Sequence, residues 1–443
     1  MKRIGYILLG SVSLLVIATL VLAQLEAPRA KSLLRVLTGK EVRGYFGTAV
    51  GPALAFNGSA PWFAVSATGE TDGPVRVGKV FFYDQLLANE PVLTIRGGES
   101  ELFGSTLAAG DCNGDGIPDL AVGAPAGQGT GLRPAGKVYL YLGGEGFGAS
   151  PAAVLSAGEA GDGFGEAISM SDDINGDSLA DLVVGAPHSR KAGATAGRAY
   201  VWFGRRSGGL GKSADAEIRL GSTNDLFGTA VATGDISGDG QADLIIGSPH
   251  DKTGEKWPGS VTVILGGKKI NFAAPSQVIW GEGMAWQDEF GASIAVIPDM
   301  NGDSAAELVV GAPQVADGGR QVGKAYLYYG GQKAQRAATF AGSAEAGRFG
   351  QHVFSLGDIN GDGKGDWAAQ AENETGSRGV VHFFYGGWDK PFQHFTGEAI
   401  ADRMGSALAV LRGMEGGPKV LVSARWNDSE ADNAGRVYLL QFE

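Results

Sequence analysis

The sequence predicts an all-β protein in which seven four-stranded antiparallel sheets form a closed ring, the architecture of a seven-bladed β-propeller. Three observations predict this fold class: a pattern that recurs seven times, short strand-like runs between tight turns, and one isolated strand near the N-terminus. The 74 glycines among 443 residues, with 44% hydrophobic residues in brief runs, favour many short strands over helices.

A Phe-Gly pair marks the frame of the repeat. After four of these pairs comes Gly-Ala-Pro or a close relative, at residues 123–125, 185–187, 247–249 and 311–313. Four strand-like runs fit within each repeat, so the repeats are expected to be the blades of the ring. The pairs are 55 to 63 residues apart and begin at Phe46, Phe103, Phe164, Phe227, Phe290 and Phe349, with Met404 as a degenerate seventh copy.

The second run of each repeat is almost entirely apolar, as in residues 119–124 and 181–186. A strand has this composition when both faces of its sheet are covered. In a propeller, the neighbouring blades would cover both faces.

The two ends of the propeller sequence predict how the ring closes. The seventh repeat ends with its third strand, at residues 435–443, whereas residues 32–39 have the form of the fourth strands and precede the first Phe-Gly pair. We therefore expect this N-terminal strand to complete blade seven and to remove an exposed sheet edge.

Three segments are expected along the chain. Residues 1–23 combine two basic residues, an uncharged apolar run and small residues at a signal-peptidase site, which is typical of a signal peptide or, uncleaved, of an N-terminal membrane anchor. Residues 24–32 are expected to be a linker and residues 33–443 the propeller. The protein is thus expected to be secreted, periplasmic or held at the cell surface.

Five repeats contain an acidic loop of nine residues between the first two strands. Oxygen-bearing side chains recur at loop positions 1, 3, 5 and 9, and position 7 would add a backbone carbonyl, an arrangement that suits Ca²⁺. One copy would be explained equally well as hairpin-turn chemistry, but five copies at the same place in the repeat favour about five structural calcium sites. The expected ligands are Asp111, Asn113, Asp115, Ile117 and Asp119; Asp173, Asn175, Asp177, Leu179 and Asp181; Asp235, Ser237, Asp239, Gln241 and Asp243; Asp299, Asn301, Asp303, Ala305 and Glu307; and Asp358, Asn360, Asp362, Lys364 and Asp366.

Glycine occupies position 4 of every loop and position 6 of three loops, where it lets the backbone wrap tightly around an ion. Ser178 and Ser304 stand at position 6 of loops two and four, which we expect to bind calcium more weakly.

The formal net charge of -12 argues against nucleic acid as a partner, and association with a membrane is expected only through residues 1–23. The five loops contain 15 carboxylates, so most of this charge is expected to serve the metal sites. The single cysteine, Cys112, excludes an internal disulfide.

The order of Phe-Gly pair, acidic loop and Gly-Ala-Pro resembles the FG-GAP repeats in the head of integrin α-subunits. The resemblance covers residues 33–443 and is most specific in blades two to five, since blade six has Gln370-Ala371-Glu372 in place of Gly-Ala-Pro and blades one and seven lack metal ligands. It implies a calcium-binding propeller that acts as a binding or adhesion module. Because no spacing exceeds 63 residues and no further domain follows Phe442, we expect a free-standing or N-terminally anchored propeller.

Recognition of an extracellular protein or glycan is expected on the rim opposite the metal loops, where the connecting loops vary most. Aromatic and arginine side chains dominate binding hot spots, although packing or solvation also explains any single one of them. The candidates are Trp257, Trp286, Trp426, Arg190, Arg320 and Arg425.

The five histidines are scattered, and no nucleophile stands beside a base in the sequence, so we expect a binding module and not an enzyme. The alternative is a calcium-dependent extracellular enzyme that acts on glycans or lipids, with its site on the propeller axis. Exposed aromatic platforms would favour glycan binding, and a deep axial pocket with unpaired carboxylates would favour catalysis.

Overall fold

A computed structural model describes residues 30–57, 61–84, 90–125, 135–148, 150–190, 195–206, 208–252, 256–282, 288–413 and 417–442. The predicted leader, residues 1–23, and residues 24–29 of the predicted linker lie outside the described residues.

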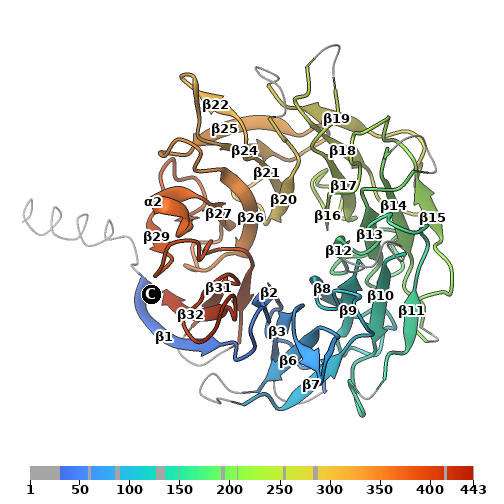
Figure 1. Ribbon diagram of the computed structural model, residues 1–443. Coiled ribbons are helices and arrows are strands. Elements are labelled where there is room, and N and C mark those ends of the chain that lie inside the picture. The colour runs from blue at the N-terminus through green and yellow to red at the C-terminus, as the bar shows by residue number, and fades with distance from the viewer. Residues whose placement is uncertain are drawn as a thin grey trace, which may run out of the picture.

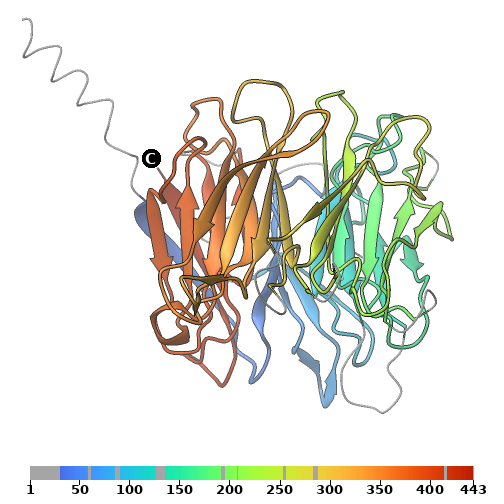
Figure 2. The same cartoon turned by 90° about the horizontal axis from the view of Figure 1, so that it is seen from above.

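Seven four-stranded antiparallel sheets stand around a common axis, with the first strand of each sheet nearest the axis (Figure 1), so the predicted fold class is confirmed. Seen at right angles to this view, loops extend from both rims of the ring (Figure 2). The blades, in chain order, are β2(Phe46–Val50), β3(Phe63–Ala67), β6(Lys79–Tyr83) and β7(Leu93–Arg96); β8(Thr106–Gly110), β9(Asp119–Ala124), β10(Lys137–Tyr141) and β11(Ala153–Leu155); β12(Ala167–Ser169), β13(Leu182–Ala186), β14(Arg198–Trp202) and β15(Ala216–Ile218); β16(Ala230–Gly234), β17(Asp243–Ser248), β18(Ser260–Ile264) and β19(Gln277–Trp280); β20(Ser293–Ile297), β21(Glu307–Ala312), β24(Lys324–Tyr329) and β25(Gln335–Ala341); β26(Phe349–Gly357), β27(Asp366–Ala371), β28(Val380–Phe384) and β29(Gln393–Thr396); and β30(Leu408–Leu411), β31(Lys419–Ala424), β32(Arg436–Phe442) and β1(Ala30–Thr38).

The N-terminal strand closes the ring as predicted. β1 pairs antiparallel with β32, with Val36 opposite Tyr438 and Leu37 opposite Val437, and Figure 1 shows the blue and red ends side by side. β1 begins at Ala30, so the strand starts inside the segment that was expected to be a linker.

The hydrophobic core lies between blades. Every residue of β9, β17, β21, β27 and β31 is buried, as the apolar second runs predict. One cluster joins Leu140 of blade two to Leu182 and Trp202 of blade three. Each blade therefore buries apolar side chains against the next one, and the whole ring is stabilised as a unit.

The two glycine motifs meet within each blade. The amide of Gly104, in the Phe-Gly pair, donates to the carbonyl of Gly123, in the Gly-Ala-Pro run, at 3.0 Å, and blades three, four and five repeat this bond at the same distance. Gly104 has φ +88°, a left-handed conformation that disfavours side chains. This hydrogen bond and the left-handed conformation of the glycine therefore explain why Phe-Gly and Gly-Ala-Pro recur together in the sequence.

Small elements decorate the rim that carries the loops between second and third strands. The hairpin β4(Thr71–Asp72) and β5(Val75–Arg76) extends blade one, and β22(Ala316–Asp317) and β23(Arg320–Gln321) extend blade five. Blade six carries the short α2(Glu374–Ser377) there. Among the described residues, no helix has the length and apolar character needed to cross a membrane.

Candidate functional site

All five acidic loops connect the first and second strands, so they share one rim of the ring. The carboxylate at loop position 1 accepts two backbone hydrogen bonds from its own loop, as Asp111 does from Gly114 (2.6 Å) and Gly116 (2.8 Å). The same two bonds occur in the other four loops. These bonds fold each loop around its first carboxylate, with the other side-chain oxygens of the loop nearby.

The carboxylate at loop position 9 lies at the start of the buried second strand. Asp119 accepts a hydrogen bond from the Cys112 amide (3.0 Å) with one oxygen and from the Gly143 amide (2.8 Å) with the other. Asp181, Asp243 and Asp366 make matching contacts to the glycine after their own third strands. This residue therefore ties the metal loop to the sheet.

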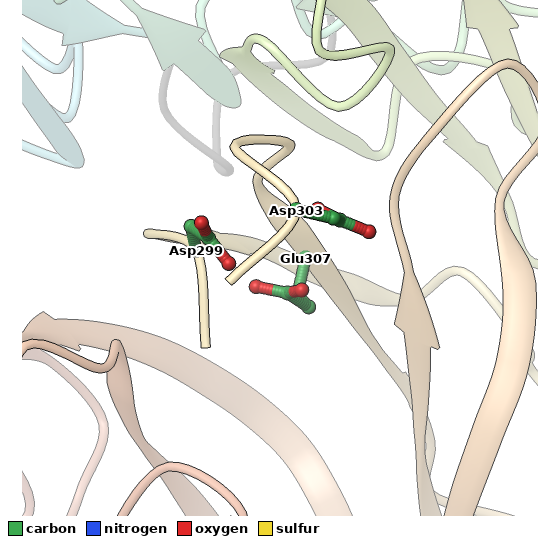
Figure 3. A group of neighbouring side chains, drawn as sticks. All are labelled: Asp299, Asp303 and Glu307. Atoms are coloured by element: carbon green, nitrogen blue, oxygen red, sulfur yellow. The ribbon is translucent and has the colours of Figure 1, made fainter. Parts of the chain in front are cut away.

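Loop four brings its acidic groups together most closely. Asp299, Asp303 and Glu307 each have one carboxylate oxygen that lies within 4.8 Å of the other two (Figure 3). Oε2 of Glu307 accepts a hydrogen bond from the Met300 amide (2.8 Å), whereas its buried Oε1 has no hydrogen-bond partner among the described residues. A divalent cation would supply that partner, so these residues fit a hard metal ion.

The other four loops hold their carboxylates farther apart. The position 5 carboxylate does not make the difference, because Asp115 of loop one accepts from the Ile117 amide (2.8 Å) and Nδ2 of Asn113 (3.0 Å) just as Asp303 of loop four accepts from its own loop. In loop two, the buried Oδ1 of Asn175, at a predicted ligand position, lacks a partner within the described structure. The structure thus brings the predicted ligands of every loop into one loop turn, but in the described chain only loop four gathers three carboxylates within 4.8 Å.

Burial makes the position 9 carboxylates easy to protonate when no cation is present. Burial raises the pKa of Asp181 and Glu307 to about 7 and that of Asp243 and Asp366 to about 6, although amide hydrogen bonds oppose the shift. Charged neighbours in the same loop add to it, such as Asp299 and Asp303 beside Glu307. A bound divalent ion would favour the ionised form.

The serines at loop position 6 adopt the backbone conformation of the glycines they replace. Ser178 has φ 69° and Ser304 has φ 71°, close to the 81° of Gly116. Loops two and four therefore keep the same wrap, at the steric cost of a β-carbon in a left-handed conformation.

Cys112, at position 2 of loop one, is fully buried, and its thiol donates to Oδ2 of Asp119 at 2.9 Å. Burial and the Asp119 charge raise the pKa of the thiol, so it stays protonated. The residue fills space beneath the loop and is not a reactive thiol.

The opposite rim carries the predicted recognition residues. The Trp426 ring lies 5.6 Å from the guanidinium of Arg425 and meets Tyr45 edge to face at 5.1 Å. Nζ of Lys252 lies 5.5 Å from the ring of Trp257. Arg190 and Arg320 are exposed on separate blades, and Trp286 lies outside the described residues.

A hollow of about 930 Å³ lies on this rim between blades four and five. Trp280, with 42% of its surface exposed, stands at its wall beside Glu282, Lys324 and Arg336. Trp280 is therefore only partly packed against its neighbours. The alternation of β19 gives the reason, because Ile279 faces the core and its neighbour in the strand must face outwards.

Sequence reasoning also missed a buried aspartate two residues before the Phe-Gly or Met-Gly pair. Asp402 accepts hydrogen bonds from the Ala399 amide (2.8 Å) and from Nδ2 of Asn427 (3.0 Å), and thereby joins two loops of the rim opposite the acidic loops. The signal was present in the sequence as a repeated spacing. Four aspartates occupy this position in their repeats, and each is at most 2% exposed: Asp162, Asp225, Asp288 and Asp402.

Comparison with known proteins identifies the repeats. Residues 103–141, 164–202, 227–264 and 290–328 match the FG-GAP repeat family, which confirms the predicted resemblance in blades two to five. Integrin alpha-5 of Xenopus laevis is 34% identical over 190 residues, which cover 40% of this chain and 17% of the integrin.

The chain is also similar to phosphatidylinositol-glycan-specific phospholipase D. The Bos taurus protein is 31% identical over 201 residues, covering 42% of this chain and 24% of the relative. The Homo sapiens protein is 29% identical over 281 residues, covering 57% of this chain and 32% of the relative. The chain thus spans about a quarter to a third of the length of these relatives.

The prediction that the chain is not an enzyme is contradicted by these relatives, which are named for an enzymatic activity. The prediction rested on histidines that are scattered in the sequence. Folding removes that argument, because Nε2 of His188 lies 3.3 Å from a Glu166 oxygen and Nε2 of His382 lies 2.9 Å from a Glu374 oxygen. Spacing along the chain therefore excludes no arrangement of acids and bases on this rim.

Proposed function

We propose that the protein is an exported, calcium-stabilised FG-GAP propeller that recognises a glycan-bearing ligand on the rim opposite its metal loops. The observation that carries the proposal is that the two rims of the ring present different chemical groups. Five acidic loops, one of which gathers three carboxylates within 4.8 Å, occupy one rim, and the hollow beside Trp280 opens on the other.

Calcium suits the acidic loops because their donors are carboxylate, amide and carbonyl oxygens. When calcium is bound, its charge would compensate the carboxylates of each loop and hold the first two strands of five blades together. The protein's own residues position the ion: position 1 folds the loop, and position 9 anchors it to the third strand. The unpartnered Oε1 of Glu307 supports loop four as the first site to test.

A saccharide suits the hollow beside Trp280. An exposed indole offers an apolar plate for a sugar ring, and the surrounding charged side chains offer donors and acceptors to hydroxyl groups. Glu282 accepts from Arg336 at 2.5 Å, and Nζ of Lys324 lies 3.9 Å from the same carboxylate, which holds these groups in place beside the indole. The name of the phospholipase D relatives, which refers to a phosphatidylinositol-glycan, supports a ligand of this class.

The test is binding of the calcium-loaded protein to a glycan array, with Trp280→Ala beside the unchanged protein. Trp388→Ala is the matched control, because Trp388 is 43% exposed and follows the third strand of blade six, on the metal-loop rim. We expect Trp280→Ala to abolish glycan binding and Trp388→Ala to retain it. Equal binding by the two variants would disprove recognition at the hollow.

A second candidate function is cleavage of a phosphatidylinositol-glycan, and the similarity to the phospholipase D relatives favours it. The assay measures release of a glycan-anchored reporter protein from membranes by the calcium-loaded protein. Release that is lost on chelation would support this function, and absence of release at high protein concentration would count against it.

A further inference from the structure

The rim of blades six and seven places two arginines beside one tryptophan and links a third arginine to them through a carboxylate. Arg403 and Arg425 place their guanidinium groups 5.3 Å and 5.6 Å from the centre of the Trp426 ring. Arg348 reaches the same group through Glu372, whose carboxylate lies 3.7 Å from Nη1 of Arg348 and 3.1 Å from Nη1 of Arg403. We call Arg348, Arg403, Arg425 and Trp426 the arginine cluster.

The arginine cluster has more hydrogen-bond donors than the described residues around it have acceptors. Nε of Arg348, Nε of Arg425 and Nε1 of Trp426 are buried, and none has a hydrogen-bond partner among the described residues. Within the described residues, Arg348 has two long ion pairs, at 3.6 Å to Glu289 and 3.7 Å to Glu372. Arg425 has no ion-pair partner in the described part of the chain. Buried donors without acceptors are rare in proteins and point to a missing partner.

The electrostatic balance of the cluster is positive. Three guanidinium groups face two carboxylates, those of Glu289 and Glu372. His352, on β26, adds no charge, because burial and the neighbouring Arg425 and Arg348 lower its pKa to about 4. The missing partner is therefore an acceptor with negative charge.

We propose that the arginine cluster binds an oxyanion, such as the phosphate, sulfate or carboxylate group of a ligand. Arg348 and Arg403 are 31% and 42% exposed, so an anion that approaches from the rim meets their terminal nitrogens first. The guanidinium forks of Arg348 and Arg425 and the indole N–H then turn toward its oxygens. This site lies in blades six and seven and is separate from the hollow between blades four and five.

The experiment is isothermal titration calorimetry of the calcium-loaded protein with sodium sulfate, phenyl phosphate and sodium acetate. The variants are Arg348→Gln, Arg425→Gln and Trp426→Phe, which removes the indole N–H and keeps an aromatic ring. Arg76→Gln is the control, since Arg76 lies on the same rim in the β4–β5 hairpin of blade one and is exposed. The melting temperature of each variant is measured in parallel, and the conservative Arg425→Lys replaces any variant that fails to fold.

We expect the unchanged protein and Arg76→Gln to bind at least one of the three anions, and the two arginine-cluster glutamine variants to bind it about tenfold or more weakly. Trp426→Phe or, where needed, Arg425→Lys should weaken binding severalfold, because each keeps the bulk of the side chain but loses a donor. Tighter binding of phenyl phosphate than of acetate would assign the site to phosphate groups, and the reverse to carboxylates. Absence of binding to all three anions, or equal binding by all variants, would overturn the proposal.

Discussion

Gly185 of blade three packs against the carbonyl oxygen of Gly228 of blade four so closely that no β-carbon fits between them. Gly228 belongs to the next Phe-Gly pair, and its own amide bonds to the carbonyl of Gly247 at 3.0 Å. The same contact recurs between Gly247 and Gly291 and between Gly311 and Gly350. The glycines of the repeat therefore set the distance between adjacent blades.

Gly185→Ala should lower the free energy of unfolding by about 1 to 3 kcal/mol, because the added methyl group overpacks the contact between blades. Thermal and denaturant unfolding followed by circular dichroism would measure the loss. Gly51→Ala is the control, since its β-carbon would approach its nearest neighbour, the Ala64 β-carbon, only to 3.3 Å. Equal stability of the two variants would refute the role of glycine in blade spacing.

A chain that begins at Gly39 lacks β1 and should aggregate, or melt at a much lower temperature, because β32 would become an exposed edge. Size-exclusion chromatography and thermal melting would reveal this. A chain that begins at Ala30 is the matched control, because it keeps the pairing of Val36 with Tyr438. A soluble monomer without β1, with an unchanged melting temperature, would contradict closure by the N-terminal strand.

The sequence was sufficient to predict the ring, its blade count and its closure, because a repeat of this kind leaves one consistent way to bury seven apolar second strands. The place of each acidic loop in its blade was also predictable, since loop position 9 comes directly at the start of the buried second strand. The directions in which the loop side chains point could not be predicted from the sequence. The spacing of Asp299, Asp303 and Glu307 equals that of Asp111, Asp115 and Asp119, and the longer side chain of Glu307 is the one difference in residue type at these positions; the described structure gathers three carboxylates within 4.8 Å only in loop four.

The sequence predicted which residues would lie on the rim opposite the metal loops, but not the contacts among their side chains. Trp426 and Arg425 were chosen by residue type, and the structure adds Arg348 and Arg403, which come from other repeats. Contacts between side chains of different blades depend on the twist and stagger of the sheets. A single sequence does not specify these quantities.

Removal of calcium with a chelator should lower the melting temperature by many degrees, because three carboxylates in each loop would then repel one another. Addition of excess calcium should restore the original melt, and excess magnesium should restore it less well, because the loops offer more oxygen ligands than Mg²⁺ accepts. Differential scanning calorimetry would measure both steps. A melting curve that chelation leaves unchanged would end the proposal of structural calcium.

Ser304→Gly should stabilise the calcium-free protein by about 0.5 to 1 kcal/mol, because glycine removes the left-handed strain while adding some entropy to the unfolded chain. Ser304 has φ 71°, so the loop need not change shape. We also expect calcium to bind loop four more tightly in this variant. Ser304→Ala, which keeps the β-carbon, is the control, and equal melting temperatures of the two variants would contradict the strain.

The stability of blade one should depend on pH through Glu70, which is 6% exposed. Burial and a hydrogen bond shared with Glu41 raise the pKa of Glu70 to about 7, from an ordinary value of 4.5, although Nζ of Lys79 lies 3.2 Å away. The folded state thus binds a proton that the unfolded state has released between these two values. Stability therefore falls as the pH rises from about 4.5 to 7.

Glu70→Gln should remove this loss, because glutamine is neutral at every pH. At pH 5 the variant and the unchanged protein should be nearly equal in stability, and above pH 7 the variant should be more stable by at most about 3 kcal/mol. Denaturant unfolding in saturating calcium across this pH range would measure the difference. Glu90→Gln is the control, because Glu90 pairs with Lys40 in an exposed ion pair and should show the pH dependence of the unchanged protein. A difference between Glu70→Gln and the unchanged protein that stays constant with pH would show that Glu70 is ionised throughout the range.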